Sequence, residues 1–410
     1  GSFASRVTFV GMNNRVSRAL IAVAASAALV FGATVVAPSW AVPSYPSAAE
    51  VAAAKKNVAA KKAMIARIEK IVQDLAVEAN KLGRVAQIKG EAFNQAQDAV
   101  DAMTAKVTSL QSQADAANAE ANKAKAQLGQ IAAQMYRDGA GGTSLNLFLN
   151  AGKADDLLYQ LGAQEKVAQQ SDTIYNRSMA KQKFAQSLTD ELAGAKAELA
   201  TKAAAAKSLF VEAQSAASAV QAKVDANNKL NKTFYAQLAV LQNTSAELER
   251  QRAEGLAAEA RQNAGTSKPV APELYAVGDA DSAKVQIALD FAKANLGERY
   301  VLGGMGPDIW DCSGITKASY AAAGIYIGTH SATNQFNTMA SARKLVPLSQ
   351  AQVGDLMWYS QDSAFNGDKY HVVIYLGGDM MLEAPNPART VRIVPLRYGE
   401  LFPYAGRPSA

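Results

Sequence analysis

The chemistry open to this chain centres on Cys312, the single cysteine among 410 residues. It stands in the run Asp311-Cys312-Ser313-Gly314, which opens an alanine-rich segment, 313–323, that predicts a short helix. Backbone N–H groups and the dipole at a helix N-terminus favour a thiolate, so a cysteine at this position can act as a nucleophile. The alternative is a small buried hydrophobic side chain, because free cysteine is among the most buried residue types.

A cysteine nucleophile needs a general base, and the chain has only two histidines, His330 and His371. Both lie in the same C-terminal region as Cys312. His371 opens the apolar run 372–376, so it is expected at the mouth of a buried strand, held by rigid backbone. A strand-end histidine whose hydrogen bonds are satisfied is the alternative.

Glu383 follows His371 closely enough in the sequence for a β-hairpin to bring the two side chains together. Gly377-Gly378-Asp379 predicts a turn into the strand 380–383, which brings Glu383 close to His371. A carboxylate on the far ring nitrogen would fix the tautomer and stabilise the imidazolium. A register slip of one residue would move Glu383 to the other face, and a solvated edge charge is the alternative.

These residues need a compact scaffold, which the sequence predicts over 282–410. A helix is expected at 283–296, followed by the Cys312 turn and helix. Strands are expected at 355–359, 371–376, 380–383 and 391–395. Helices followed by antiparallel strands are typical of an α+β domain.

A much longer helical region, 42–263, precedes this domain. Apolar and alanine residues recur there at alternating steps of three and four over about ten heptads, which indicates a coiled coil. A glycine-rich break after Arg137 divides the pattern, so we expect an antiparallel hairpin with its tip at about 137–158. A parallel dimer of one continuous helix is the alternative, and the four glycines between 139 and 152 argue against it.

The ends of these regions carry their own signals. Arginines, an apolar run and small residues before Ala41 predict a secretory signal peptide at 1–41, with an uncleaved membrane anchor as the alternative. Residues 264–281 contain prolines and glycines without periodicity and predict a linker. In an exported protein a lone cysteine has no internal partner, which favours a functional thiol.

Other chemistry is poorly supported. The net charge of +6 is spread without a dense basic block, so no nucleic-acid partner is expected. The run 303–306 lacks the strand, helix and lysine of a phosphate loop, and the acidic residues and histidines near Cys312 lack zinc-ligand spacing. We therefore expect neither a metal nor another cofactor.

From about 283 to 407 the chain resembles the NlpC-type, papain-like cysteine peptidases of bacterial cell walls. The matching segments, in chain order, are 299–304, 311–314, 331–335, 353–356, 371–377 and 381–385. The resemblance implies an α+β papain-like catalytic domain, which would follow the antiparallel coiled-coil hairpin expected from the periodicity. It also implies hydrolysis of peptidoglycan stem peptides, often between D-glutamate and a diamino acid such as diaminopimelate.

The resemblance assigns roles residue by residue. It makes Cys312 the nucleophile, His371 the base and Glu383 the third polar residue, where glutamate is typical of actinobacterial Rip-type members. The residues expected to line the substrate site are Tyr300, Asp311, Ser313, His330 and Ser331. Leu302 replaces the usual aromatic residue, and His330 stands where arginine is common, so it would contact substrate or face solvent.

The break in the coil has a resemblance of its own. Residues 134–139, 145–149 and 155–158 are similar to the hairpin tip of division-associated hydrolase regulators, which implies binding to the extracellular domain of the membrane protein FtsX. An ordinary hairpin turn is the alternative. The implied protein is secreted, lies at the septal cell wall and is shielded by its coil until FtsX engages the tip. A catalytically degenerate scaffold, or an amidase or acyltransferase on the same fold, are the alternatives.

Overall fold

The computed structural model describes residues 45–137, 154–262 and 267–410. The expected signal peptide, 1–41, and most of the expected hairpin tip therefore lie outside the described residues. In the part of the chain that is described, no helix combines the length and hydrophobicity needed to cross a bilayer.

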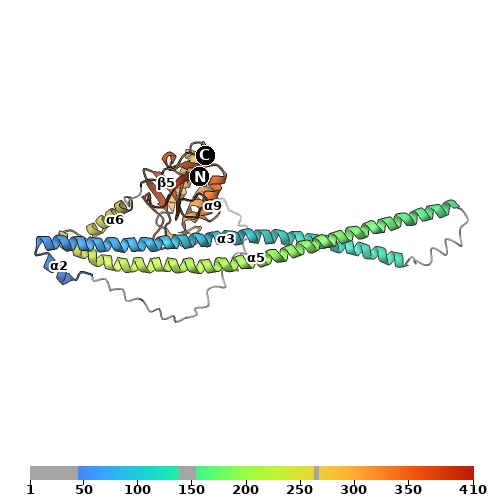
Figure 1. Ribbon diagram of the computed structural model, residues 1–410, viewed down its shortest axis with the longest axis horizontal. Helices are drawn as coiled ribbons and strands as arrows, with labels where there is room; N and C mark the ends of the chain where they lie inside the picture. Colours follow the sequence, from blue (N-terminus) through green and yellow to red (C-terminus); the bar gives the residue numbers. More distant parts are fainter. Residues whose placement is uncertain (1–44, 138–153, 263–266) are drawn as a thin grey trace, which may run out of the picture. The chain divides into compact units, whose positions relative to one another are not determined.

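Two long helices, α3 (Val58–Arg137) and α5 (Ala154–Gln242), lie side by side (Figure 1). Ion pairs join Glu78 to Lys223, Lys89 to Glu212 and Glu120 to Lys181. Residue numbers fall along one helix as they rise along the other, so the two helices run in opposite directions. Their shared core is made largely of small and aliphatic side chains: Met103, Leu110, Ala114, Ala117, Ala121, Ala185, Leu188, Leu192 and Ala195.

Shorter helices flank this pair. Helix α2 (Ala48–Ala54) precedes α3, and α6 (Ala246–Gln262) follows α5. The sequence predicted one helical segment running to Asn263, but Asn243 adopts a left-handed conformation (φ 60°) that ends α5. Asparagine tolerates this conformation better than most residues because its short polar side chain can hydrogen-bond locally.

Helix α3 runs unbroken through Gly83 and Gly90, although glycine usually weakens a helix interior. These glycines instead make room for the C-terminal region. A Cβ atom on Gly90 would lie 3.1 Å from Leu302 Cδ1, and one on Gly83 would lie 2.8 Å from Asn386 Nδ2. The missing side chains let the helix backbone approach closely.

The C-terminal region combines three helices with a six-stranded sheet. The helices are α7 (Ser282–Ala294), α8 (Cys312–Ala322) and α9 (Ala332–Ser341). The short strands β1 (Arg299–Tyr300) and β2 (Ile309–Trp310) pair with each other. The main sheet has the order β3-β8-β4-β5-β6-β7, with strands β3 (Leu345–Pro347), β4 (Leu356–Ser360), β5 (Lys369–Gly377), β6 (Met380–Glu383), β7 (Arg392–Pro395) and β8 (Leu401–Gly406), and a 3-10 turn η1 (Leu348–Gln350) after β3.

Four of these six strands match the segments expected from sequence, whereas α9, β3 and β8 were not predicted. Strand β3 is only three residues long and ends at Pro347. Strand β8 contains Pro403 and ends at Gly406, two residue types that are depleted in strands. Pairing with neighbours, rather than local propensity, holds these two strands in the sheet.

The two faces of the sheet pack against different partners. One core contains Trp358, Val372 and Ile374 with side chains of α7, α8 and α9. The alternate residues Tyr359 and Val373 belong to a second core with other side chains of the sheet. Ile88 of α3 also packs against this second core. Strand β5 is buried from both sides along most of its length, which makes it a rigid support for His371.

Residues 267–281, most of the expected linker, carry no helix or strand but lie against the sheet region. The Leu345 N–H donates to Tyr275 Oη at 3.2 Å, and the Arg407 guanidinium donates to the Gly278 carbonyl at 3.0 Å. Tyr404 Oη donates to the Pro272 carbonyl at 3.0 Å. This segment is therefore tied down along its length.

Candidate active site

Cys312 is the first residue of α8, and Gly314, two residues later in the helix, packs against the glycine-rich turn that precedes it. The Asp311 carboxylate caps the helix by accepting a hydrogen bond from the Gly314 N–H at 2.8 Å. A Cβ atom on Gly314 would lie only 1.9 Å from the Gly304 carbonyl oxygen. The glycine at this position therefore lets the glycine-rich turn close onto the start of the helix that carries Cys312.

The Cys312 thiol is enclosed, with 7% of the residue exposed. Its sulfur lies within reach of the backbone N–H groups of Val372 and Ser313, so Cys312 contacts strand β5 next to His371. Burial, reinforced by the charges of Asp311 and Glu91, raises the pKa of Cys312 well above its ordinary value. In this arrangement the thiol is held in its neutral form.

His371 and Glu383 meet on one face of the hairpin formed by β5 and β6. The register pairs Ile374 with Leu382, which places both functional side chains on the same face. His371 Nε2 lies 2.8 Å from Glu383 Oε2, and both side chains are fully buried. The other ring nitrogen, Nδ1, is buried without a hydrogen-bond partner among the described residues. Burial lowers the pKa of His371, against the opposing effect of Glu383.

Two arginines that sequence reasoning missed also bind Glu383. Arg392 donates to Oε1 at 2.8 and 3.1 Å, and Arg397 donates to Oε1 and Oε2 at 2.9 Å each. Burial alone would raise the pKa of Glu383, but Arg397, His371 and Arg392 outweigh it and hold that pKa well below its ordinary value. Glu383 is therefore a buried carboxylate. No motif in the sequence indicated these arginines, because both lie beyond the recognised segments.

Asp311 and His330 form a second carboxylate–imidazole pair beside Cys312. His330 Nε2 lies 2.7 Å from Asp311 Oδ1, and Ser313 Oγ donates to the same oxygen at 3.3 Å. Burial opposes the charged form of each partner, yet their mutual attraction lowers the pKa of Asp311 and raises that of His330. His330 neither faces open solvent nor stands apart from the site: it is mostly buried and bound to the helix cap.

The remaining expected site residues line the same region. Tyr300 is 8% exposed, and burial together with the charges of Asp311 and Cys312 raises its pKa well above the ordinary value. Ser331 caps α9, its Oγ accepting from the Asn334 N–H at 3.0 Å. The structure thus brings all eight expected side chains, from Tyr300 to Glu383, into one continuous region around α8, α9 and β5.

Helix α3 covers this region, which the sequence did not indicate residue by residue. The Glu91 carboxylate accepts hydrogen bonds from Ser331 Oγ at 2.6 Å, from the Ala332 N–H at 2.9 Å and from the Thr333 N–H at 3.0 Å. Asn94 Nδ2 donates to Asp311 Oδ2 at 3.1 Å. Glu91 and Asn94 are both buried by these contacts.

Further contacts extend this cover. Gln95 Nε2 donates to Thr333 Oγ1 at 3.1 Å, and Thr329 Oγ1 donates to Asp98. At the other side, Gln87 Nε2 donates to the Pro385 carbonyl at 2.7 Å, and Arg84 forms an ion pair with Glu400. Residues 84–98 of α3 therefore lie across the candidate site from one rim to the other.

Within the described ranges, no group of three or more histidine, cysteine or carboxylate side chains is arranged to hold a metal ion. The region around Cys312 contains two imidazole–carboxylate pairs, His330 with Asp311 and His371 with Glu383, together with backbone N–H groups. This set is suited to proton transfer and to stabilising charge around a sulfur nucleophile.

Residues 297–401 match the model of the NlpC/P60 family. Over 104 residues, 25% of the chain, the sequence is 39% identical to peptidoglycan endopeptidase RipA of Mycobacterium tuberculosis, 20% of whose length is covered. Over 119 residues, 29% of the chain, it is 33% identical to the gamma-D-glutamyl-L-lysine dipeptidyl-peptidase of Bacillus cereus, with 34% of that protein covered.

A solved structure of the peptidoglycan hydrolase RipB from Mycobacterium tuberculosis is 28% identical in sequence, with a TM-score of 0.27, covering 31% of this chain and 66% of that one. The chain spans 20% of the length of RipA and 36% of the length of RipB from Mycobacterium tuberculosis, and so only part of these curated relatives. The long helices lie outside the matched family segment, which begins at residue 297. Residues 297–401 of this chain thus form an NlpC/P60 domain similar to that of the Rip-type peptidoglycan endopeptidases.

Proposed function

We propose that this chain is a cysteine endopeptidase that hydrolyses stem peptides of peptidoglycan. The observation that carries the proposal is the buried His371, which is bound through Nε2 to Glu383 and directly precedes Val372, the residue whose N–H approaches the Cys312 sulfur. A nucleophile, a base and a group that orients the base are the parts that covalent amide hydrolysis needs.

In the acylation step His371 Nδ1 takes the proton of the Cys312 thiol as the sulfur attacks the amide carbon. A C–S bond forms and the carbonyl oxygen becomes an oxyanion, which backbone N–H groups at the start of α8 stabilise. The C–N bond then breaks, and the imidazolium returns its proton to the leaving amine. Glu383 keeps the proton of His371 on Nε2, so that Nδ1 is free to act.

In the deacylation step His371 removes a proton from water, which attacks the thioester carbon. The C–S bond breaks, the new carboxylic acid leaves, and the Cys312 sulfur regains a proton from the imidazolium. The cycle consumes one water for each amide bond and needs no cofactor. The proposed substrate bond joins D-glutamate to diaminopimelate, in line with the relatives that are named as peptidoglycan endopeptidases.

We further propose a division of the chain into the signal peptide (1–41), a coiled-coil hairpin with regulatory function (42–263), a linker (264–281) and the peptidase domain (282–410). In this closed arrangement the coiled coil inhibits the peptidase. The contacts of Glu91 with Ser331, and of Asn94 with Asp311, support this proposal, because they occupy the surface where substrate would bind.

The proposed activator is the extracellular domain of FtsX, in the FtsEX complex, which would bind the hairpin tip and draw α3 away from the site. This makes the protein a RipC-type endopeptidase, secreted to the cell wall and active in separating daughter cells at the septum. Its proposed partners are peptidoglycan and FtsX.

The test is digestion of purified peptidoglycan followed by mass spectrometry. The full chain and its Glu91→Ala variant, in which the cover is weakened, are each compared with the same protein carrying Cys312→Ala. New stem-peptide ends that need Cys312 support the proposal. Release of a product from a different bond would indicate an amidase, and no product from any form would indicate a scaffold; either result refutes it.

A further inference from the structure

Glu383 accepts hydrogen bonds from two arginines and is also bound to His371, and this environment goes beyond what a simple triad requires. We propose that Arg397 and Arg392 are positioning residues that act through Glu383 on His371, fixing the carboxylate against the imidazole and offsetting its negative charge. The inference rests on the proposed function, because that function defines His371 as the base.

Arg397 is fixed at both ends. Its guanidinium donates to both oxygens of Glu383, a bidentate geometry that defines orientation as well as energy. The guanidinium carbon also lies 4.9 Å above the ring of Tyr359. Tyr359 Oη donates to the Arg397 carbonyl at 3.0 Å and accepts from its N–H at 3.3 Å, so that one tyrosine locks both the backbone and the side chain of Arg397.

Tyr359 links this clamp to the imidazole itself. It lies opposite His371 in the register of β4 and β5, and the two ring centroids are 5.7 Å apart. Any displacement of Arg397 would therefore disturb the packing of the His371 ring as well as the carboxylate that holds it.

Arg392 approaches Glu383 from the neighbouring strand. The register of β6 and β7 places the two residues directly opposite each other, where cross-strand side chains are in contact. Both of its hydrogen bonds go to Oε1. This leaves Oε2 to His371 Nε2 and one N–H group of Arg397. With both oxygens bound, the carboxylate cannot rotate away from His371.

The positive charges of Arg392 and Arg397 help to keep His371 in its neutral form. Glu383 alone would favour an imidazolium at His371, which cannot accept the thiol proton. The charged groups acting on His371 are Glu383, Arg397 and Arg392, and the two arginines lower its pKa in the same direction as burial. Removing either arginine should strengthen the pull of Glu383 and raise the pKa of His371.

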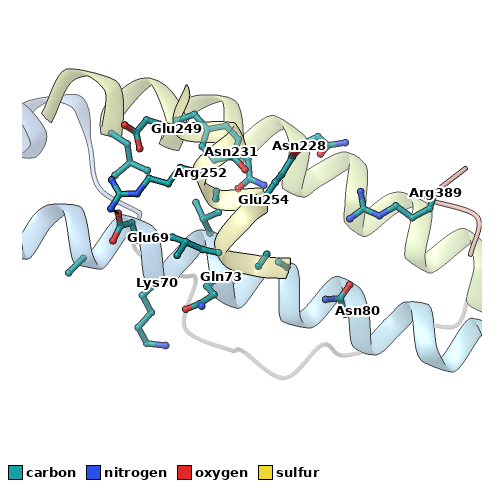
Figure 2. Close-up of a pocket in the computed structure, with 18 of the residues that line it drawn as sticks. Glu69, Lys70, Gln73, Asn80, Asn228, Asn231, Glu249, Arg252, Glu254 and Arg389 are labelled. Carbon is teal, nitrogen blue, oxygen red and sulfur yellow. Dashed lines mark ion pairs between the residues drawn. The ribbon is translucent and has the colours of Figure 1, made fainter. Parts of the chain in front are cut away.

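Arg389 provides a matched control three residues before Arg392. Both arginines line a cavity of about 780 Å³ that α3, α5 and α6 also border. Figure 2 shows Arg389 in the wall of this cavity, and the side chain is exposed. Arg389→Gln thus removes the same charge close to Arg392 without removing a hydrogen bond to Glu383.

The experiment is an NMR titration of the His371 ring in the full chain. Because the chain has two histidines, His330→Asn leaves His371 as the single ring signal, and every variant is made in that background. We expect Arg397→Gln to raise the titration midpoint by roughly one pH unit. Arg392→Gln should give a smaller rise and Arg389→Gln none. Arg397→Lys keeps the charge and is expected to restore most of the midpoint while losing the bidentate contact.

A pH profile of kcat/KM for stem-peptide cleavage provides the second readout, with the acid limb moving upward in the same order. A merely structural role would lower the rate at every pH without moving that limb. An unchanged His371 midpoint in folded Arg397→Gln and Arg392→Gln proteins would overturn the inference. The titration needs no substrate. Midpoints that shift in the expected order, together with no cleavage, would therefore refute the proposed function but support the positioning role of the arginines.

Discussion

The Glu91 carboxylate lies 2.6 Å from Ser331 Oγ, although 240 residues separate the two in the chain. Glu91 also receives the first two backbone N–H groups of α9, so a residue of the long helix α3 supplements the N-terminal cap of a helix in the NlpC/P60 domain. An anion at a helix N-terminus is favoured by the unpaired N–H groups and by the dipole. One side chain therefore holds α3 against the start of α9, and this is the contact through which we propose that α3 shields Cys312.

Replacing Glu91 with alanine should expose Cys312. The change removes three hydrogen bonds that Glu91 accepts, each worth about 0.5–1.5 kcal/mol. We expect alkylation of the full chain by iodoacetamide to accelerate at least about tenfold, which corresponds to roughly 1.4 kcal/mol of lost docking energy. The rate reports Cys312 alone, because the chain contains no other cysteine.

The matched control for that experiment is Glu120→Ala. Glu120 is also on α3 but pairs with Lys181 of α5, 2.7 Å away, so its loss should leave the alkylation rate unchanged. Equal rates for wild type and Glu91→Ala would show that α3 does not shield the thiol through this contact.

Docking of α3 should weaken as pH rises. Burial raises the pKa of Glu91 to about 7, against the opposing hydrogen bonds from Ser331, Thr333 and Ala332. A pKa raised in the docked state means that protonation favours docking, so this contribution is complete below about pH 4.3 and is lost as pH passes through 7. From these values the docking constant should fall about tenfold between pH 6 and pH 8.

The measurement is the alkylation rate of wild type divided by that of Glu91→Gln at each pH. Both rates depend on ionisation of the Cys312 thiol, and much of this shared dependence cancels in the ratio. The glutamine cannot titrate, so the ratio should rise with pH. The pKa of Asp98, bonded to Thr329, is raised by burial as well and should leave a weaker dependence of the same sign in the variant. A ratio that falls with pH would contradict the role assigned to Glu91.

Gly314→Ala should destabilise the NlpC/P60 domain. The added methyl group would lie 1.9 Å from the Gly304 carbonyl oxygen. Because that oxygen belongs to the backbone, the clash can be relieved only by moving the glycine-rich turn or the start of α8. We expect a loss of at least about 2 kcal/mol in the free energy of unfolding, measured by denaturant titration. Gly278→Ala is the control, because no atom lies within 4 Å of its Cβ position, and a similar loss there would show that the Gly304 contact is not the cause.

The three proposed catalytic side chains should differ in their effect. Cys312→Ala and His371→Ala are expected to abolish release of stem peptides in the Glu91→Ala background, whereas Glu383→Ala should leave residual cleavage, because it orients the base without reacting. Removing Glu383 also leaves Arg392 and Arg397 without their anion, at a cost of about 3–5 kcal/mol. Thermal unfolding of each variant must therefore accompany the digestion assay, and full activity in Cys312→Ala would refute the mechanism.

Local pattern was enough to find the parts of the candidate site. Cys312 at a helix start, His371 at the head of an apolar run and Glu383 after a glycine turn are all short-range features. Sequence pattern likewise predicted four strands at nearly their observed bounds and two long helical segments, the second of which is divided at Asn243 into α5 and α6. Strands β3 and β8 and helix α9 escaped because their residues have weak propensities and gain stability from neighbours distant in sequence.

The amino-acid sequence alone was sufficient to select the residues proposed to react and their order, because each is marked by a local signal within a few positions. The surroundings of these residues depend on the three-dimensional packing of the chain. The register of β5 and β6 put Glu383 on the face of His371, strand β7 supplied Arg392, and the segment after β7 supplied Arg397. The close approach of α3 at Gly90 brought Glu91 to Ser331. The contacts of Glu383 span 9 to 14 residues and that of Glu91 with Ser331 spans 240, and both kinds are set by strand register, packing and charge complementarity that no local pattern encodes.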